Sequence, residues 1–226
     1  HIDFHYVSMQ TMAQSSHWPA ADLVILPGSK NVRADLAFVR EQGWDIALKK
    51  HLRYGGKVVG ICGGYQMLGE LIDDPLGIED RAGCSDGLGL LPITTVLTAS
   101  KTLTQVRGHL RLQDQQAEFS GYEIHCGESS LTQSDVIQPL SIEHYTQQPM
   151  AITKLDGMVS NDQQILATYV HGLFDHPAAC QLILQWAGLD SRHAIDINQI
   201  REQQLNRLAD VLEAHLDMNT LKGIIS

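Results

Sequence analysis

The stretch KVVGICGGYQMLG, residues 57–69, changes abruptly from an apolar run to a cluster of glycines. A short continuous apolar run is typical of a strand buried on both faces, and the residues after the glycines favour a helix. Cys62 lies at the turn between them, in the pattern Gly60-Ile61-Cys62-Gly63-Gly64. A strand, a sharp turn and a helix are therefore predicted here, which is the repeating unit of an α/β fold.

The same alternation is found elsewhere in the chain. The run LVIL within residues 21–30 predicts a second buried strand that ends at Pro27-Gly28, and residues 31–54 have helical spacing. Strands are also predicted at 2–7 and 163–170, helices at 64–72, 177–187 and 197–216, a glycine-rich loop at 77–91, and strand-like alternation between the loop and residue 125. Strands and helices that alternate with short joints predict one α/β domain over residues 1–226, built on a parallel sheet covered on both faces.

Composition limits the classes of partner. The chain has 226 residues, 43% of them hydrophobic, and a formal net charge of −10, which argues against a nucleic-acid backbone or an anionic membrane as the main partner. It has no apolar run of transmembrane length and no signal peptide, so we expect a cytoplasmic protein. The sequence begins with His1 inside the strand-like segment HIDFHYV, which suggests a piece of a longer chain.

The four cysteines (62, 84, 126 and 180) form no CxxC pair, so we expect reduced thiols and no metal site. Cys62 differs from the others because G-x-Cys-x-G at a strand-to-helix turn is the pattern of a nucleophile elbow. The following helix would favour a thiolate, and the Gly63 amide could donate to an oxyanion. A buried core thiol is the competing interpretation, and the elbow pattern alone does not decide between them.

A catalytic thiol needs a base, and His171 is the best candidate among eleven histidines. In the segment ILATYVHGLFD it follows a predicted buried strand directly, as Cys62 does. Groups at the carboxyl ends of parallel strands meet in one crevice, so these two side chains can approach each other. The Pro27-Gly28 corner ends a third strand, and its Gly28 amide could be a second oxyanion donor.

Four segments together resemble a known family: LPGSKNVRADL, VVGICGGYQMLG, GYEIHCGE and TYVHGLFD. In this order and spacing they are similar to the glutamine amidotransferase domain of cobyric acid synthases, a branch of the class I, triad-type amidotransferases. The similarity runs through essentially the whole chain. It implies a flavodoxin-like, open and mostly parallel sheet with helices on both faces.

The resemblance also implies roles for single residues. Cys62 would attack the side-chain amide of L-glutamine, and His171 would take the thiol proton and give it to the departing ammonia. The amides of Gly28 and Gly63 would form the oxyanion hole. Gln66 would shape the substrate pocket, and Glu123 and His125 of GYEIH would contact the substrate.

The implied function is supply of ammonia to a synthetase. In this family a separate N-terminal domain uses ATP and Mg²⁺ to activate carboxylates of the corrin ring of adenosylcobyrinic acid a,c-diamide, which become amides in cobyric acid. This chain has no P-loop, so the resemblance makes it the glutaminase part, with no cofactor of its own. The alternatives are a glutaminase of a sibling amido-ligase (cobyrinic acid a,c-diamide synthase or cell-wall lipid II amidation), another cysteine hydrolase, or a non-catalytic docking module.

One position departs from the wider class, in which a glutamate two residues after the histidine orients its ring. Leu173 stands there and cannot accept a hydrogen bond. Asp175, Glu123 or a carboxylate of the synthetase domain could replace it, or Cys62 and His171 could act as a dyad. Because a poorly oriented base is slow, we expect weak glutaminase activity from this chain alone.

Overall fold

The computed structural model describes residues 2–8, 18–145, 148–189 and 197–216. In chain order its elements are β1 (Leu23–Leu26), α2 (Val32–Glu41), α3 (Trp44–Arg53), β2 (Lys57–Ile61), α4 (Gly63–Leu68), β3 (Leu71–Asp74), β4 (Gly83–Asp86), β5 (Ile93–Leu112), β6 (Gln115–Leu131), β7 (Leu140–Tyr145), β8 (Gln148–Asp156), β9 (Met158–Val159), β10 (Ile165–Thr168), β11 (Val170–His171), α5 (Pro177–Trp186) and α6 (Ile197–His215).

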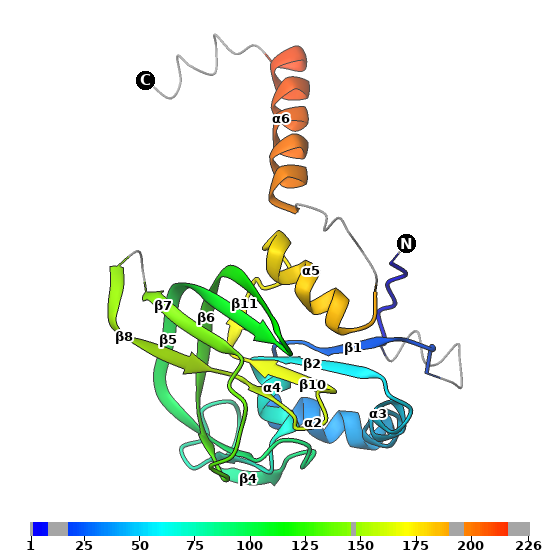
Figure 1. The fold of residues 1–226 in the computed structure, drawn as a ribbon, viewed down its shortest axis with the longest axis vertical. Helices are drawn as coiled ribbons and strands as arrows, with labels where there is room; N and C mark the ends of the chain where they lie inside the picture. The colour runs from blue at the N-terminus through cyan, green and yellow to red at the C-terminus, as the bar shows by residue number, and fades with distance from the viewer. Residues whose placement is uncertain (1, 9–17, 146–147, 190–196, 217–226) are drawn as a thin grey trace.

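The first sheet has the strand order β1-β2-β10-β9, with β1, β2 and β10 parallel and β9 antiparallel to β10. Its inner strand β2 is buried on both faces, as its apolar sequence predicts. Val58 packs with residues of α2, α3 and α4, whereas Val59 packs with residues of α5. Helices therefore cover both faces, and the predicted α/β class is confirmed (Figure 1).

A second sheet is formed mainly by the middle of the chain. Its order is β11-β6-β5-β3-β4, with β7 and β8 added along β5, and all its pairings are antiparallel except that of β3 with β5. The long strands β5 and β6 curve around one side of the molecule in Figure 1. The strand-like alternation of this region predicted the strands but not that they form a separate sheet.

The chain crosses from one sheet to the other within a few residues. Strand β10 ends at Thr168, paired with β2 of the first sheet, and β11 begins at Val170, paired with β6 of the second. The described residues form two hydrophobic cores, and each core takes residues from both sheets. Cys62 and Tyr65 belong to the core beneath α2 and α3, whereas Val170 and Leu173 belong to the core beneath α5.

Three sequence-based boundaries are wrong. Residues 2–7 form no strand, although Ile2, Phe4 and Tyr6 alternate, because a strand needs a paired neighbour and none of the described strands pairs with this segment. The helix predicted over 31–54 is two helices, separated where Gly43 adopts φ 67°. The helix predicted over 64–72 spans only Gly63–Leu68, and its last residues belong to β3.

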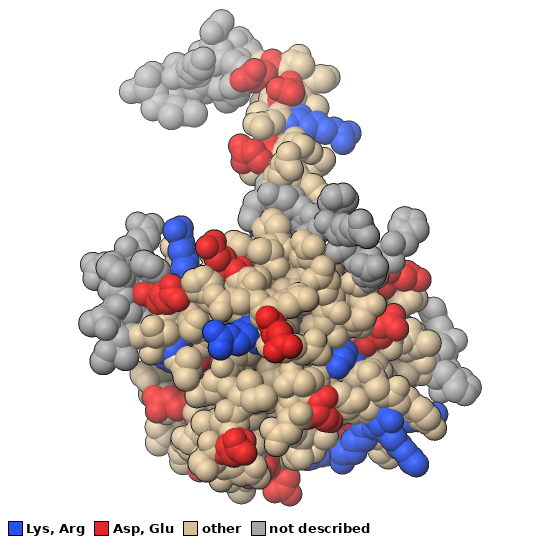
Figure 2. Space-filling model, viewed as in Figure 1, with Lys and Arg blue, Asp and Glu red and all other residues tan. Residues whose placement is uncertain are grey.

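On the face in Figure 2, acidic and basic side chains are interspersed over most of the surface, and several basic side chains gather at the lower right. Within the described residues, no helix is both long enough and apolar enough to span a membrane.

Candidate active site

Cys62 and His171 come together beyond the carboxyl ends of neighbouring parallel strands. Strand β2 ends just before Cys62, and the Cys62 amide donates a 2.9 Å hydrogen bond to the carbonyl of Thr168, the last residue of β10. A Cβ atom built on Gly28 would lie 3.3 Å from His171 Cε1 and 3.7 Å from Cys62 Cβ. Three segments far apart in sequence therefore meet at one point, where the sequence predicted a crevice.

The backbone at Cys62 is strained, as expected for a nucleophile elbow. Cys62 has φ 54° and ψ −108°, a conformation that a residue with a side chain rarely adopts. The glycines around it are required by close contacts. A Cβ on Gly64 would lie 2.1 Å from the Leu26 carbonyl oxygen, and one on Gly63 would lie 2.7 Å from the Ser29 nitrogen. The strand-to-helix turn is therefore in close contact with the end of β1 and the loop after it.

The surroundings of Cys62 favour the thiol over the thiolate. Burial raises its pKa above the ordinary value, and a hydrogen bond from the Gly63 amide lowers it by less. The Sγ atom lies 3.5 Å from the carbonyl oxygen of Ile124, to which the thiol donates. We expected the N-terminus of α4 to favour the thiolate, but α4 has only six residues and burial is the larger effect.

The Pro27-Gly28 corner is held by caps on helix α2. Asn31 is the N-cap, and its side chain accepts a 3.1 Å hydrogen bond from the Ala34 amide. Ser29 Oγ accepts from the Asn31 amide at 3.0 Å and donates to Asp35 at 2.5 Å. The polar residues of the GSKN sequence thus fix the loop that brings Gly28 to Cys62.

The surroundings of His171 favour the neutral imidazole. Burial lowers its pKa below the ordinary value, and nearby His125 lowers it further. Its Nε2 atom is buried and has no hydrogen-bond partner in the described part of the structure. The ring lies parallel to that of Tyr122, with 5.0 Å between the ring centroids and 6° between the planes. A neutral imidazole beside a neutral thiol is a pair between which a proton can move.

The two carboxylates of this chain that we considered as orienting groups both have other partners. Asp175 lies 3.3 Å from Arg201 of helix α6, and Glu123 lies 3.2 Å from Lys154. Within the described residues no hydrogen bond joins either one to His171. Leu173, at the position of the class glutamate, is fully buried in the core beneath α5.

Glu123 is on the wrong side of its strand for the substrate-binding role expected of it. In the antiparallel pairing of β11 with β6, Val170 is opposite Glu123 and His171 is opposite Tyr122. Opposed residues share a face and neighbours alternate, so Glu123 and His171 project to opposite faces. The Glu123 side chain is fully buried.

Gln66 and His125 are both held against Tyr169. Gln66 Nε2 donates to the Tyr169 hydroxyl at 3.2 Å, and the His125 ring stacks on the Tyr169 ring with 3.9 Å between centroids. His125 Nδ1 donates to the Gly127 carbonyl at 2.7 Å, which leaves Nε2 with a lone pair in the neutral ring. Nε2 is buried and has no partner among the described residues. It is therefore a free acceptor close to the site.

A buried pair that the sequence analysis missed holds the strand before His171. Thr168 Oγ1 donates to Asp156 Oδ2 and accepts from the Val170 amide at 3.0 Å. The same Asp156 oxygen accepts from the Tyr169 amide at 3.2 Å. Burial raises the pKa of Asp156, and the neighbouring Glu123 carboxylate raises it further. No motif marks this pair, because its residues belong to different segments and meet only in the fold.

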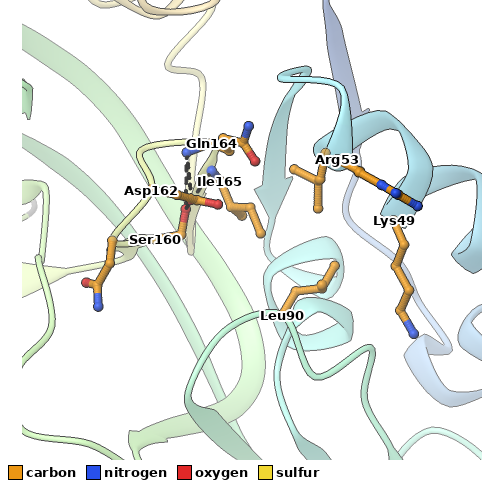
Figure 3. A pocket seen from close by; sticks show the side chains of 9 residues that line it. Lys49, Arg53, Leu90, Ser160, Asp162, Gln164 and Ile165 are labelled. Carbon is orange, nitrogen blue, oxygen red and sulfur yellow. Dashed lines mark hydrogen bonds between the residues drawn. The ribbon is translucent and has the colours of Figure 1, made fainter.

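A separate depression of about 510 Å³ lies at the opposite end of the first sheet. It is lined by Lys49 and Arg53 of α3 and by the turn Ser160–Ile165 that leads into β10 (Figure 3). Parallel strands begin on this side and end at Cys62 and His171, so the depression is not part of the candidate active site.

The comparisons with known proteins agree with this geometry. The model of the CobB/CobQ-like glutamine amidotransferase domain matches residues 3–179. The chain belongs to this family and is a glutamine amidotransferase domain.

Its relatives include a cobyric acid synthase. The enzyme of Shewanella oneidensis (strain ATCC 700550 / JCM 31522 / CIP 106686 / LMG 19005 / NCIMB 14063 / MR-1) is 59% identical over 235 residues, which cover 100% of this chain and 45% of that protein. The chain thus spans less than half the length of this relative.

Two solved structures also match. The crystal structure of a glutamine amidotransferase is 17% identical, with a TM-score of 0.49 over 74% of this chain and 80% of its own. PurLQS from Thermotoga maritima is 17% identical, with a TM-score of 0.45 over 66% of this chain and 68% of its own. At these TM-scores we draw no argument from either structure.

Proposed function

We propose that this chain hydrolyses L-glutamine through a Cys62 thioester and supplies ammonia to a cobyric acid synthase. One observation carries the proposal: Gly28, Cys62 and His171 meet at the ends of three chain segments, so that a single added methyl group on Gly28 would touch both side chains. The identity of 59% with a cobyric acid synthase supports the choice of pathway.

The chemistry follows from the protonation states. His171, neutral because burial lowers its pKa, takes the proton of the Cys62 thiol while sulfur attacks the side-chain carbonyl carbon of glutamine. The Gly63 amide already faces Sγ, and Gly28 lies against Cys62, so their amides are suited to bind the oxyanion. The imidazolium then gives its proton to the leaving nitrogen, ammonia departs, and water hydrolyses the thioester.

Recognition of glutamine is assigned to groups that remain free to bind. His125 Nε2 is a buried acceptor suited to an N–H group of the substrate, and its ring cannot turn freely because Gly127 and Tyr169 hold it. Gln66 shapes the pocket in part by holding Tyr169, to whose hydroxyl one of its two amide N–H groups donates. We no longer assign Glu123 to the substrate.

The synthetase reaction belongs to a different polypeptide region. We propose that ATP and Mg²⁺ act there, on corrin carboxylates of adenosylcobyrinic acid a,c-diamide, and that this chain contributes only ammonia. Because no carboxylate of the described residues orients His171, glutamine hydrolysis by this chain alone should be slow and should accelerate when the synthetase region is supplied.

The direct test is covalent labelling with 6-diazo-5-oxo-norleucine, an electrophilic glutamine analogue, followed by peptide mass spectrometry. The label should be on Cys62, and the His171→Ala variant should remain unlabelled at neutral pH. The exposed Cys84 is an internal control for unspecific alkylation. Labelling of Cys84, Cys126 or Cys180 in preference to Cys62 contradicts the proposal.

A further inference from the structure

Tyr122 lies beside the ring of His171, for which the sequence provides no orienting glutamate because Leu173 stands at that position. The two residues are directly opposed in the β11–β6 pairing, and their rings are parallel within 6° at a centroid separation of 5.0 Å. Tyr122 is 44% exposed, so it contributes little to either hydrophobic core. Its contact with His171 is therefore the clearest consequence of having an aromatic residue at this position.

The face of an aromatic ring attracts a cation within about 6 Å of its centroid. His171 has no charge until it receives the Cys62 proton, and burial disfavours the imidazolium that then forms. A ring stacked at 5.0 Å offsets part of this burial effect and of the effect of nearby His125, and it favours one orientation of the imidazole plane. Both effects are those that a hydrogen-bonded carboxylate has in triad enzymes.

We propose that Tyr122 is a positioning residue for His171, which holds the imidazole plane and stabilises its protonated form during glutamine hydrolysis. The inference rests on the proposed function. The proton leaves Cys62 Sγ for the imidazole, the sulfur electron pair forms the bond to the glutamine carbonyl carbon, and the imidazolium lies over the Tyr122 ring. The proton then passes to the leaving nitrogen as the C–N bond breaks. Because the cation exists only between these steps, Tyr122 should affect kcat and leave KM unchanged.

The test compares Tyr122→Leu with Tyr122→Phe in the 226-residue chain. Phe keeps the aromatic face and should retain kcat within about twofold, whereas Leu should lower kcat by about 3- to 30-fold, the range of cation–π contributions. KM for glutamine should stay within about twofold in both variants. Tyr54→Leu is the matched control, because Tyr54 is also an exposed tyrosine and lies after α3, away from the site.

A second measurement does not depend on turnover. The pKa of His171, followed by NMR of its imidazole protons and assigned by their absence in His171→Gln, should be lower in Tyr122→Leu than in the unchanged chain. An unchanged pKa together with unchanged kcat overturns the proposal, and so does a Phe variant as slow as the Leu variant. If the unchanged chain does not hydrolyse glutamine at all, the proposed function fails, while the NMR titration still decides whether Tyr122 stabilises the imidazolium.

Discussion

The Thr168 hydroxyl bridges Asp156 and the Val170 amide at the point where the chain leaves one sheet for the other. Thr168→Val keeps the shape of the side chain but removes both hydrogen bonds in a fully buried place. The free energy of unfolding should fall by about 1–3 kcal/mol, and glutamine hydrolysis should slow because His171 follows this junction. Urea denaturation and an ammonia assay measure the two effects. Thr168→Ser keeps the hydroxyl and should restore both; a serine variant as impaired as valine would contradict this role.

Gly28 and Gly63 should respond differently to alanine. A methyl group on Gly28 meets His171 at 3.3 Å without backbone strain, so Gly28→Ala should fold normally and lose about 10- to 100-fold in kcat. A methyl group on Gly63 meets the Ser29 nitrogen at 2.7 Å, and that variant should lose about 1–3 kcal/mol of unfolding free energy. Kinetics combined with denaturation separates the two cases. Equal stability of both variants would show that the contact at Ser29 relaxes easily.

The backbone strain at Cys62 should be measurable as stability. With φ at 54°, Cys62→Gly should be more stable than Cys62→Ala by about 1 kcal/mol, although glycine has one carbon less to bury. Ala179→Gly in helix α5 is a control in which the effect of glycine should have the opposite sign. The glycine variant there should be less stable than the unchanged chain by about 1 kcal/mol. Both comparisons use chemical denaturation. Equal destabilisation by glycine at both positions would mean that Cys62 is not strained.

Alkylation of Cys62 by iodoacetamide, which lacks the shape of glutamine, should accelerate with pH. Burial raises the pKa of the thiol, so the thiolate fraction and the alkylation rate should rise to a midpoint above the usual range of a cysteine. The acid limb of kcat/KM for glutamine should lie below the usual range of a histidine, because His171 must lose its proton to act as a base and burial lowers its pKa. Peptide-resolved mass spectrometry follows Cys62 separately from the other cysteines. An alkylation midpoint below pH 8 would instead indicate a thiolate–imidazolium pair.

The sequence predicted best the positions of residues that lie near the end of a strand recognisable from a short apolar run. The runs LVIL and KVVGI are long enough and apolar enough to mark buried strands, and Cys62, Gly28 and His171 each lie within three residues of the end of a strand of the first sheet. Since parallel strands end at one edge, their meeting could be predicted without knowing any distance.

The errors concern pairings between distant segments. Whether Glu123 faces His171 depends on the register of β6 with β11, and the letters GYEIH contain no information about that register. The contact of Asp156 with Thr168 and the stack of Tyr122 on His171 depend on the same long-range pairings. Residues 2–7 alternate like a strand, but the pattern does not show whether a partner strand exists.

Nucleophile and base depend on different hydrophobic cores. Cys62 belongs to the core beneath α2 and α3, and His171 follows a residue of the core beneath α5. Each core takes residues from both sheets, so the distance between sulfur and imidazole is fixed by the packing of both. A substitution that loosens either core should therefore lower thermal stability and activity together.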